Sequence, residues 1–222
     1  MQVELSLVAG LDAPLDPRGA PMAWCAADQE VAPRFAEPFA IDPGGLSFEG
    51  EVVPSFGVWN GIAAARRARL VAQFRLTRWR GASDFMLELL PEDDALRIAV
   101  ARLAGVRTLG EAGLRITGAL RQGNLLSWSW PGRGPKRERL GLRDCVRVPL
   151  VRAVGQSGAA RLSIDLGTGG EEEPVPAAIT EGRADAYRQK VLIDEPFFLW
   201  VGERRTLAAH VVARIARLTP GA

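Results

Sequence analysis

Cysteine and histidine are scarce in this 222-residue sequence, which contains Cys25, Cys145 and His210 alone of these two types. Two cysteines cannot form a disulfide framework, and neither lies in a CxxC motif. These three residues also do not supply the soft or imidazole ligands of a zinc site. A Ser-His-Asp triad would have to use His210, but no serine lies in a GxSxG motif. We therefore expect a protein that is not an enzyme and that carries no cofactor.

Long apolar runs and an excess of charge of one sign are also absent. No run reaches the roughly 18 apolar residues that a membrane-spanning helix needs, and the N-terminus lacks the basic leader of a signal peptide. Lysine and arginine total 28 against 26 acidic residues, a net charge of +2. Neither a membrane nor a nucleic acid is therefore expected as a partner, and the cellular compartment stays open. Apolar residues make up 47% of the chain, enough for a sizeable core.

Alternating and continuous apolar segments predict a protein rich in β-strands. Residues 69–79 alternate apolar and polar side chains, and residues 85–91 form a second such run after a break at Gly81. Two runs about a turn apart predict a hairpin. Further strands are expected over residues 3–8, 114–120, 125–130, 159–166 and 191–201.

Helical spacing occurs in two segments. Residues 91–105 begin with a proline and three acids, which is typical of a first helical turn, and end at a glycine. The acids Glu92-Asp93-Asp94 could alternatively bind a cation through oxygen ligands, but we favour their role at a helix start. Residues 207–218 carry apolar side chains three or four positions apart, so periodicity alone predicts an amphipathic helix.

Two segments predict irregular structure. Residues 12–45 contain six prolines and are expected to hold at most one short edge strand. Residues 167–186 combine glycine, glutamate and proline without apolar periodicity. A loop of this length is unusual in a compact domain and is often functional, so we expect it to be exposed and mobile.

Arginine gathers in two stretches of the sequence. The first contains Arg66, Arg67, Arg69, Arg75, Arg78 and Arg80, and the second contains Arg133, Lys136, Arg137, Arg139 and Arg143. Either stretch could bind a polyanion electrostatically, with Arg133, Lys136, Arg137 and Arg139 as the possible contacts. The simpler interpretation, which we favour, is that both are solvated polar faces.

A series of short motifs, taken in chain order, resembles the C-terminal part of a serpin. The motifs are Val3-Glu-Leu-Ser-Leu-Val-Ala9, Arg34-Phe-Ala-Glu-Pro-Phe39, Val53-Pro54, Phe85-Met-Leu-Glu-Leu-Leu-Pro91, Leu140-Gly-Leu-Arg-Asp144, residues 156–166, Glu195-Pro-Phe-Phe-Leu199 and Val212-Ala-Arg214. They span nearly the whole chain, whereas the N-terminal helices and first sheet strands of the family have no counterpart.

This resemblance implies an α+β, serpin-like multi-sheet fold dominated by antiparallel strands with a few helices and truncated at its N-terminus. Residues 1–222 are expected to form a single, partial domain. The resemblance replaces the helix over residues 207–218 by a strand paired with residues 196–202. It also predicts that residues 3–8 lack neighbouring strands, so that an open sheet edge could support self-association.

By the same resemblance, residues 167–186 are similar to a serpin reactive loop. Gly167, Gly169 and Gly170 take the place of its hinge. With Gly169 as the hinge glycine the scissile bond falls at Arg183-Ala184, whereas with Gly167 in that place it would shift to Glu181. An arginine at that bond suits trypsin-like serine proteases, whose pocket carries a carboxylate.

Inhibition by a serpin requires the cleaved loop to insert into the main sheet as a new strand. Here the inserting segment contains Glu172, which is costly to bury, and Pro174 and Pro176, which cannot donate ladder hydrogen bonds. We therefore expect a protease inhibitor or a degenerate relative that presents the loop and is cleaved as a substrate. The alternative is a non-inhibitory serpin-like binding module that uses its arginines for a polyanion.

Overall fold

The computed structural model describes residues 2–37, 39–59, 62–79, 83–122, 135–167 and 187–218, without the side chain of Pro43. Within these ranges the chain forms an 11-stranded sheet, a 4-stranded sheet and two helices, α1 (Ala64–Ala72) and α2 (Leu109–Gln122). Most strand pairings are antiparallel. The fold is thus the multi-sheet α+β type that the sequence predicts. No helix in these ranges is long and apolar enough to cross a membrane.

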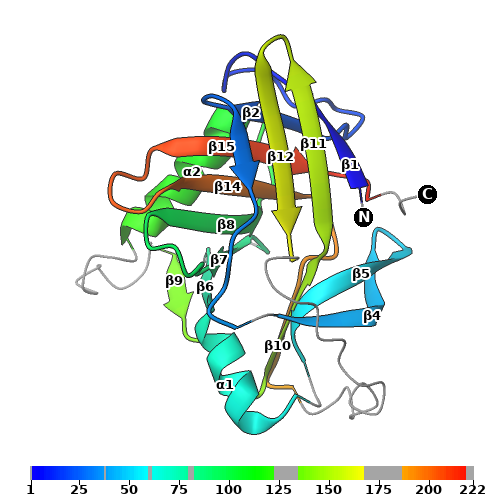
Figure 1. The fold of residues 1–222 in the computed structure, drawn as a ribbon, viewed down its shortest axis with the longest axis vertical. Helices are drawn as coiled ribbons and strands as arrows, with labels where there is room; N and C mark the ends of the chain where they lie inside the picture. Colours follow the sequence, from blue (N-terminus) through cyan, green and yellow to red (C-terminus); the bar gives the residue numbers. More distant parts are fainter. Residues whose placement is uncertain are drawn as a thin grey trace.

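The larger sheet has the strand order β3-β12-β11-β1-β2-β15-β14-β8-β7-β6-β9. Its strands are β1 (Gln2–Leu7), β2 (Met22–Cys25), β3 (Gln29–Val31), β6 (Phe74–Arg78), β7 (Phe85–Leu89), β8 (Leu96–Arg102), β9 (Lys136–Glu138), β11 (Val151–Ser157), β12 (Ala160–Leu166), β14 (Phe197–Glu203) and β15 (Ala209–Ile215). Figure 1 shows the β11–β12 hairpin standing across the direction of β8, β14 and β15.

β1 joins these two parts of the larger sheet. Its first residues, from Gln2 to Leu5, pair in parallel with β11, whereas Ser6 and Leu7 pair with the start of β2. A single strand therefore connects the hairpin to the central strands.

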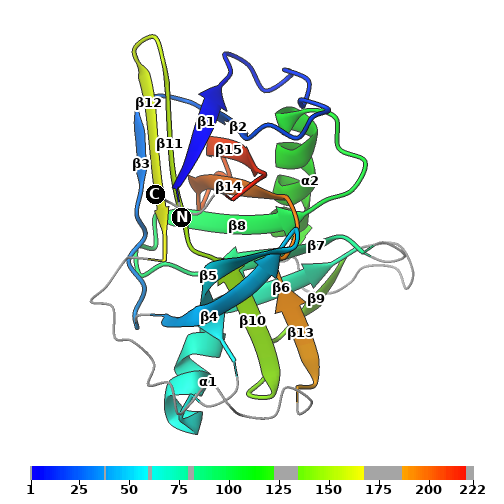
Figure 2. The ribbon, with the colours of Figure 1, turned by 90° about the vertical axis from the view of Figure 1, so that its right-hand side faces the viewer.

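The smaller sheet has the order β13-β10-β5-β4. It consists of β4 (Ala40–Phe48), β5 (Glu51–Val58), β10 (Asp144–Pro149) and β13 (Gln189–Leu192). Figure 2 shows this sheet below the central strands, with α1 beneath it.

Apolar side chains cover both faces of the central strands. On one face, Ala99, Trp200 and Val212 pack with Ala112 and Ile116 of α2. On the other face, alternate residues of the same strands join the main core between the sheets. Burial on both faces makes β7, β8, β14 and β15 nearly continuous apolar runs.

Several sequence predictions are confirmed. Strands occur at residues 3–8 and 159–166 as β1 and β12, and β6 and β7 form the predicted antiparallel hairpin. β15 pairs antiparallel with β14, from Phe197–Ile215 to Gly202–Ala209. The resemblance therefore gave the correct structure for residues 207–218, and the helical periodicity did not.

The predicted strand or strand pair over 191–201 is two strands, β13 and β14, in different sheets. The strand expected over 125–130 lies outside the described residues.

Two segments were predicted in the wrong state. The helix expected over residues 91–105 is the strand β8, so Glu92-Asp93-Asp94 precede a strand instead of beginning a helix. The strand expected over residues 114–120 is part of α2. β8 has both faces buried, with alanines on the face that packs on α2, and this hides its period of two.

Two further predictions were wrong in part. The expected strand over 69–79 begins with the last residues of α1, and the segment 12–45 contains β2, β3 and the start of β4. The open edge expected at β1 is also wrong, because β1 lies between β11 and β2. Among the described strands, the outer ones are β3 and β9 in the larger sheet and β4 and β13 in the smaller sheet.

Candidate functional site

The predicted reactive segment begins at Gly167, directly after β12. Gly167 has a φ of +107°, and a Cβ atom there would lie 2.3 Å from Leu150 Cδ2 and 2.9 Å from Phe56 Cδ1. Only glycine fits this backbone and this packing. Gly167, which the resemblance places at the hinge, is therefore a tightly packed residue directly after β12. The other predicted loop residues, Gly169, Gly170, Arg183 and Ala184, lie outside the described residues.

An ion pair holds the chain just before β13. Arg188 donates from Nε and Nη2 to the two carboxylate oxygens of Asp144, at 2.9 and 2.6 Å. The Asp144 side chain is fully buried, and the backbone N–H of Gly141 donates to it at 2.5 Å. Burial by itself would raise the pKa of Asp144, but hydrogen bonds from Arg188, Gly141 and Gln189 hold that pKa below its usual value. Arg188 and Asp144 thus fasten the start of β13 beside β10.

Arg67 of α1 adds to this anchor from the other side. Its Nη2 donates to the backbone oxygen of Asp144 at 2.8 Å, and its guanidinium lies 5.8 Å from the ring centre of Tyr187. Arg67 is buried, so the interpretation of its arginine stretch as a solvated face is wrong at this position. The sequence contains no signal for this long-range contact.

The strand next to β12 decides whether the larger sheet has room for another strand. β3 pairs in parallel with β12 from Gln29–Leu162 to Val31–Ile164. Val31 is buried in the main core, and Asp28 accepts a hydrogen bond from the N–H of Arg161 at 2.8 Å. The free side of β12 is therefore occupied along three of its residues.

Two of the expected polyanion contacts, Lys136 and Arg137, are paired with glutamates. Lys136 Nζ lies 3.3 Å from Glu138, and Arg137 Nη2 donates to Glu88 at 2.9 Å. The carbonyl of Arg139 accepts a hydrogen bond from Arg188. Arg133 lies outside the described residues. β9 does not therefore present its basic side chains as an unpaired patch.

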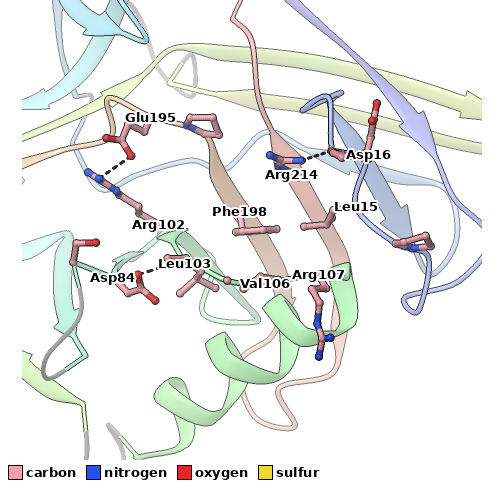
Figure 3. Close-up of a pocket in the computed structure, with 16 residues that line it drawn as sticks. Leu15, Asp16, Asp84, Arg102, Leu103, Val106, Arg107, Glu195, Phe198 and Arg214 are labelled. Carbon is pink, nitrogen blue, oxygen red and sulfur yellow. Dashed lines mark hydrogen bonds and ion pairs between the residues drawn. The ribbon is translucent and has the colours of Figure 1, made fainter.

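A pocket of about 630 Å³ lies between the chain after β8, the start of β14 and the end of β15 (Figure 3). Its lining includes Leu103 and Phe198, and two of its arginines have partners within the lining. Arg102 pairs with Glu195 at 2.7 Å, and Arg214 donates to the carbonyl of Asp16 at 3.0 Å.

The buried carboxylate of this pocket also has protein partners. Asp84 accepts hydrogen bonds from Arg115 Nη2 at 2.5 Å and from the N–H of Ala104 at 3.0 Å. These bonds tie α2 to the loops at the ends of β7 and β8. They give this side of the pocket a structural role.

The residues considered for catalysis and metal binding do not come together. Over the described ranges, no three residues among histidine, cysteine, aspartate and glutamate cluster as metal ligands. Cys25 and Cys145 are free thiols, of which Cys145 is buried and Cys25 is half-buried. Burial raises the pKa of both thiols.

Comparison with known proteins gives structural matches. No protein-family model matches the chain, and no curated protein matches it in sequence. Solved serpin structures are similar in fold. Native protease nexin-1 with heparin is 14% identical, with a TM-score of 0.41, over 86% of this chain and 54% of that chain. Thyroxine-binding globulin in complex with thyroxine is 14% identical, with a TM-score of 0.46, over 85% and 54%.

Uncleaved ovalbumin is a third serpin of this kind, 12% identical with a TM-score of 0.40, over 84% of this chain and 54% of that chain. The chain therefore spans about half the length of the serpins that it matches. The neighbours are serpins, as the sequence resemblance predicted. At these identities the likeness concerns the fold alone.

Proposed function

We propose that this serpin-like chain presents residues 168–186 to trypsin-like serine proteases as a cleavable segment and does not trap the protease. The observation that carries the proposal is the position of β3. A trap requires the cleaved segment to add to the larger sheet beside β12, and β3 occupies that side along Leu162–Ile164.

Displacing β3 has an energetic cost. Its backbone hydrogen bonds to β12 each contribute about 0.5–1.5 kcal/mol, and Val31 would leave the core, where it is 4% exposed. The incoming segment would also have to bury Glu172 and place Pro174 and Pro176 in a ladder without donors. Both the displacement of β3 and the burial of the incoming segment therefore oppose insertion.

The two ends of the segment are held in different sheets. Gly167 follows β12 of the larger sheet, and the Arg188–Asp144 ion pair fixes β13 in the smaller sheet. β14 and β15, which follow β13, lie between β8 and β2 in the larger sheet. A cut at Arg183 would therefore leave the C-terminal fragment attached through strands at the centre of the fold.

Incubation with trypsin followed by a denaturing gel tests the proposal. We expect one early cut after Arg183, two fragments on the gel, and co-elution of both fragments in gel filtration without denaturant. Arg183→Gln should remove the early cut, whereas Arg152→Gln, at an exposed position on β11, should keep it. A protease–protein complex that survives the denaturing gel would overturn the proposal.

The alternative of a polyanion-binding module at Arg133, Lys136, Arg137 and Arg139 has less support. Lys136 and Arg137 are each paired with a glutamate, so the net charge of β9 is partly neutralised.

A further inference from the structure

Arg214 of β15 interrupts an apolar row on the face of the larger sheet that packs on α2. Strand register places Arg214 directly opposite Phe198 of β14 on one side and Met22 of β2 on the other. The row continues from Phe198 to Ala101 of β8, and its three apolar members belong to the core beneath α2. Residues directly opposite each other in antiparallel strands have Cβ atoms about 4.5–5.5 Å apart. The guanidinium of Arg214 is therefore carried by a side chain that starts within an apolar surface.

The end of this row borders the pocket of about 630 Å³ shown in Figure 3. Phe198 and Leu103 are buried and give the pocket apolar surface, and the partly buried Leu15 and Val106 pack beside them. Figure 3 shows Phe198 between Leu103 and Leu15, with the guanidinium of Arg214 close to this group. The volume lies in the range of about 300–1,000 Å³ that is typical of pockets for small molecules.

Two of the carboxylates that line the pocket are neutralised by arginines. Glu195 pairs with Arg102 at 2.7 Å, and the buried Asp84 pairs with Arg115 of α2 at 2.5 Å. Arg102 also lies 3.7 Å from Asp194. These acids are therefore engaged and do not act as counter-ions of Arg214.

Arg214 itself has a single protein partner. Its Nη1 donates to the carbonyl of Asp16 at 3.0 Å, and no described carboxylate forms an ion pair with it. The carboxylate of Asp16 accepts a hydrogen bond from the N–H of Arg18 at 2.8 Å instead. A guanidinium has five N–H donors, and that of Arg214 is half-buried. Burial of a charge without an ion partner is costly, and an anion bound in the pocket would remove this cost.

We propose that the pocket binds a small organic anion with an apolar body and one carboxylate. The apolar body lies on Phe198 and Leu103, between Leu15 and Val106, and the carboxylate accepts hydrogen bonds from Arg214. The planar fork of a guanidinium matches the two oxygens of a carboxylate. A single negative charge is favoured because the pocket offers one arginine without an ion partner and is also lined by neutralised acids.

Isothermal titration calorimetry with three probes tests both parts of the site. Cinnamate carries an apolar body and a carboxylate, cinnamyl alcohol carries the apolar body alone, and acetate carries the carboxylate alone. We expect saturable binding of one cinnamate per chain and about tenfold weaker binding of the alcohol, the loss expected for a charge-assisted hydrogen bond. Acetate should show no measurable binding at the same concentrations.

Variants of Arg214 identify the residue that recognises the charge. Arg214→Gln should weaken cinnamate binding about tenfold and leave binding of cinnamyl alcohol unchanged. Arg214→Lys keeps the charge and should restore part of the preference for cinnamate. Arg152→Gln is the matched control, because it removes an exposed arginine on β11 and should keep the full affinity for cinnamate. Urea unfolding shows first that each variant is folded.

The apolar wall is tested separately, so the proposal stays open to refutation even if Arg214→Gln does not fold. Leu15→Ala should weaken the binding of cinnamate and of cinnamyl alcohol by the same factor, about fivefold, because both probes lose the same apolar contact. Equal affinities of the wild type for cinnamate and cinnamyl alcohol would overturn the proposal. Unchanged cinnamate binding in a folded Arg214→Gln variant, or the absence of saturable binding in the wild type, would also overturn it.

Discussion

Two hairpins of the larger sheet differ in how they are buried. In β14–β15 most residues are buried and none is fully exposed, because α2 covers one face and the main core covers the other. In β11–β12 buried and exposed residues alternate, because one face is open to solvent. The β14–β15 hairpin lies between β2 and β8, which have four and seven residues. β12 has only the three-residue β3 on its outer side.

The two hairpins therefore have different roles in the proposed function. The β14–β15 hairpin follows residues 168–186 in the chain, so under the proposed function it would retain the chain after a cut. The β11–β12 hairpin has one solvent-exposed face and ends directly before Gly167. A protein that is cleaved as a substrate needs only a hairpin that retains the fragment after the cut. A protein that traps its protease also needs a hairpin beside which a new strand can insert.

Truncation of a central side chain should have the largest effect. Trp200 of β14 is 0% exposed, and Trp200→Ala should lower the free energy of unfolding by about 3–5 kcal/mol. Val154 of β11 is 43% exposed, and Val154→Ala should change it by less than about 0.5 kcal/mol. Urea denaturation of both variants gives the comparison. Similar losses in the two would remove the distinction between the hairpins.

The turn after β12 should be the second most sensitive position. Gly167→Ala introduces a Cβ close to Leu150 and Phe56 at a positive φ, and should cost about 2–3 kcal/mol. Gly158→Ala is the matched control, because Gly158 has a φ of +59° with no atom within 4 Å of the added Cβ. Its cost should be limited to about 1 kcal/mol of backbone strain. Equal costs at both positions would show that the packing of Gly167 contributes nothing.

The anchor of β13 should have a smaller effect that depends on pH. The folded-state pKa of Asp144 is lowered, so its contribution is present above the unfolded value of about 3.9 and is lost as the pH falls through the folded value. Because Arg188 is 59% exposed, solvent screening weakens this ion pair, and Arg188→Ala should cost less stability than Gly167→Ala.

Urea titrations at pH 7 and pH 3 measure this contribution. The difference in stability between the wild type and Asp144→Asn should be larger at pH 7 than at pH 3. Arg69→Ala is the control, because the Arg69–Glu37 pair lies at the surface, with Arg69 76% exposed. A pH-independent difference at Asp144 would contradict the charged anchor.

The sequence predicted strands where polar and apolar residues alternate or where a turn signal lies beside the strand. β12 alternates clearly, and β6–β7 carried a turn signal at Gly81. β8 and β15 are buried on both faces, so their apolar residues also fit helical spacing, and only the family resemblance gave the correct state of β15.

Helix α2 had a readable signal that the strand prediction missed. Thr108 and Glu111 have the spacing of a capping box, and the Thr108 hydroxyl accepts a hydrogen bond from the N–H of Glu111 at 3.1 Å. Leu109, Ala112, Ile116 and Leu120 then follow at helical spacing.

Long-range pairs could not be predicted from the sequence. Arg188 with Asp144 and Arg137 with Glu88 are separated by 44 and 49 residues and depend on strand register. Composition revealed an excess of arginine, but only the structure shows which carboxylates those arginines pair with. The family resemblance alone places a hinge at Gly167, and that role stays a prediction.

Thermal unfolding of the intact and the trypsin-cleaved protein tests the central claim most directly. If the segment after β12 is a substrate that does not enter the sheet, cleavage after Arg183 should leave the Tm unchanged within about 2 °C, since 1 kcal/mol shifts the Tm of a chain of this size by about 2–4 °C. A rise well above this range would show that the segment displaces β3 and inserts beside β12, and it would contradict the account.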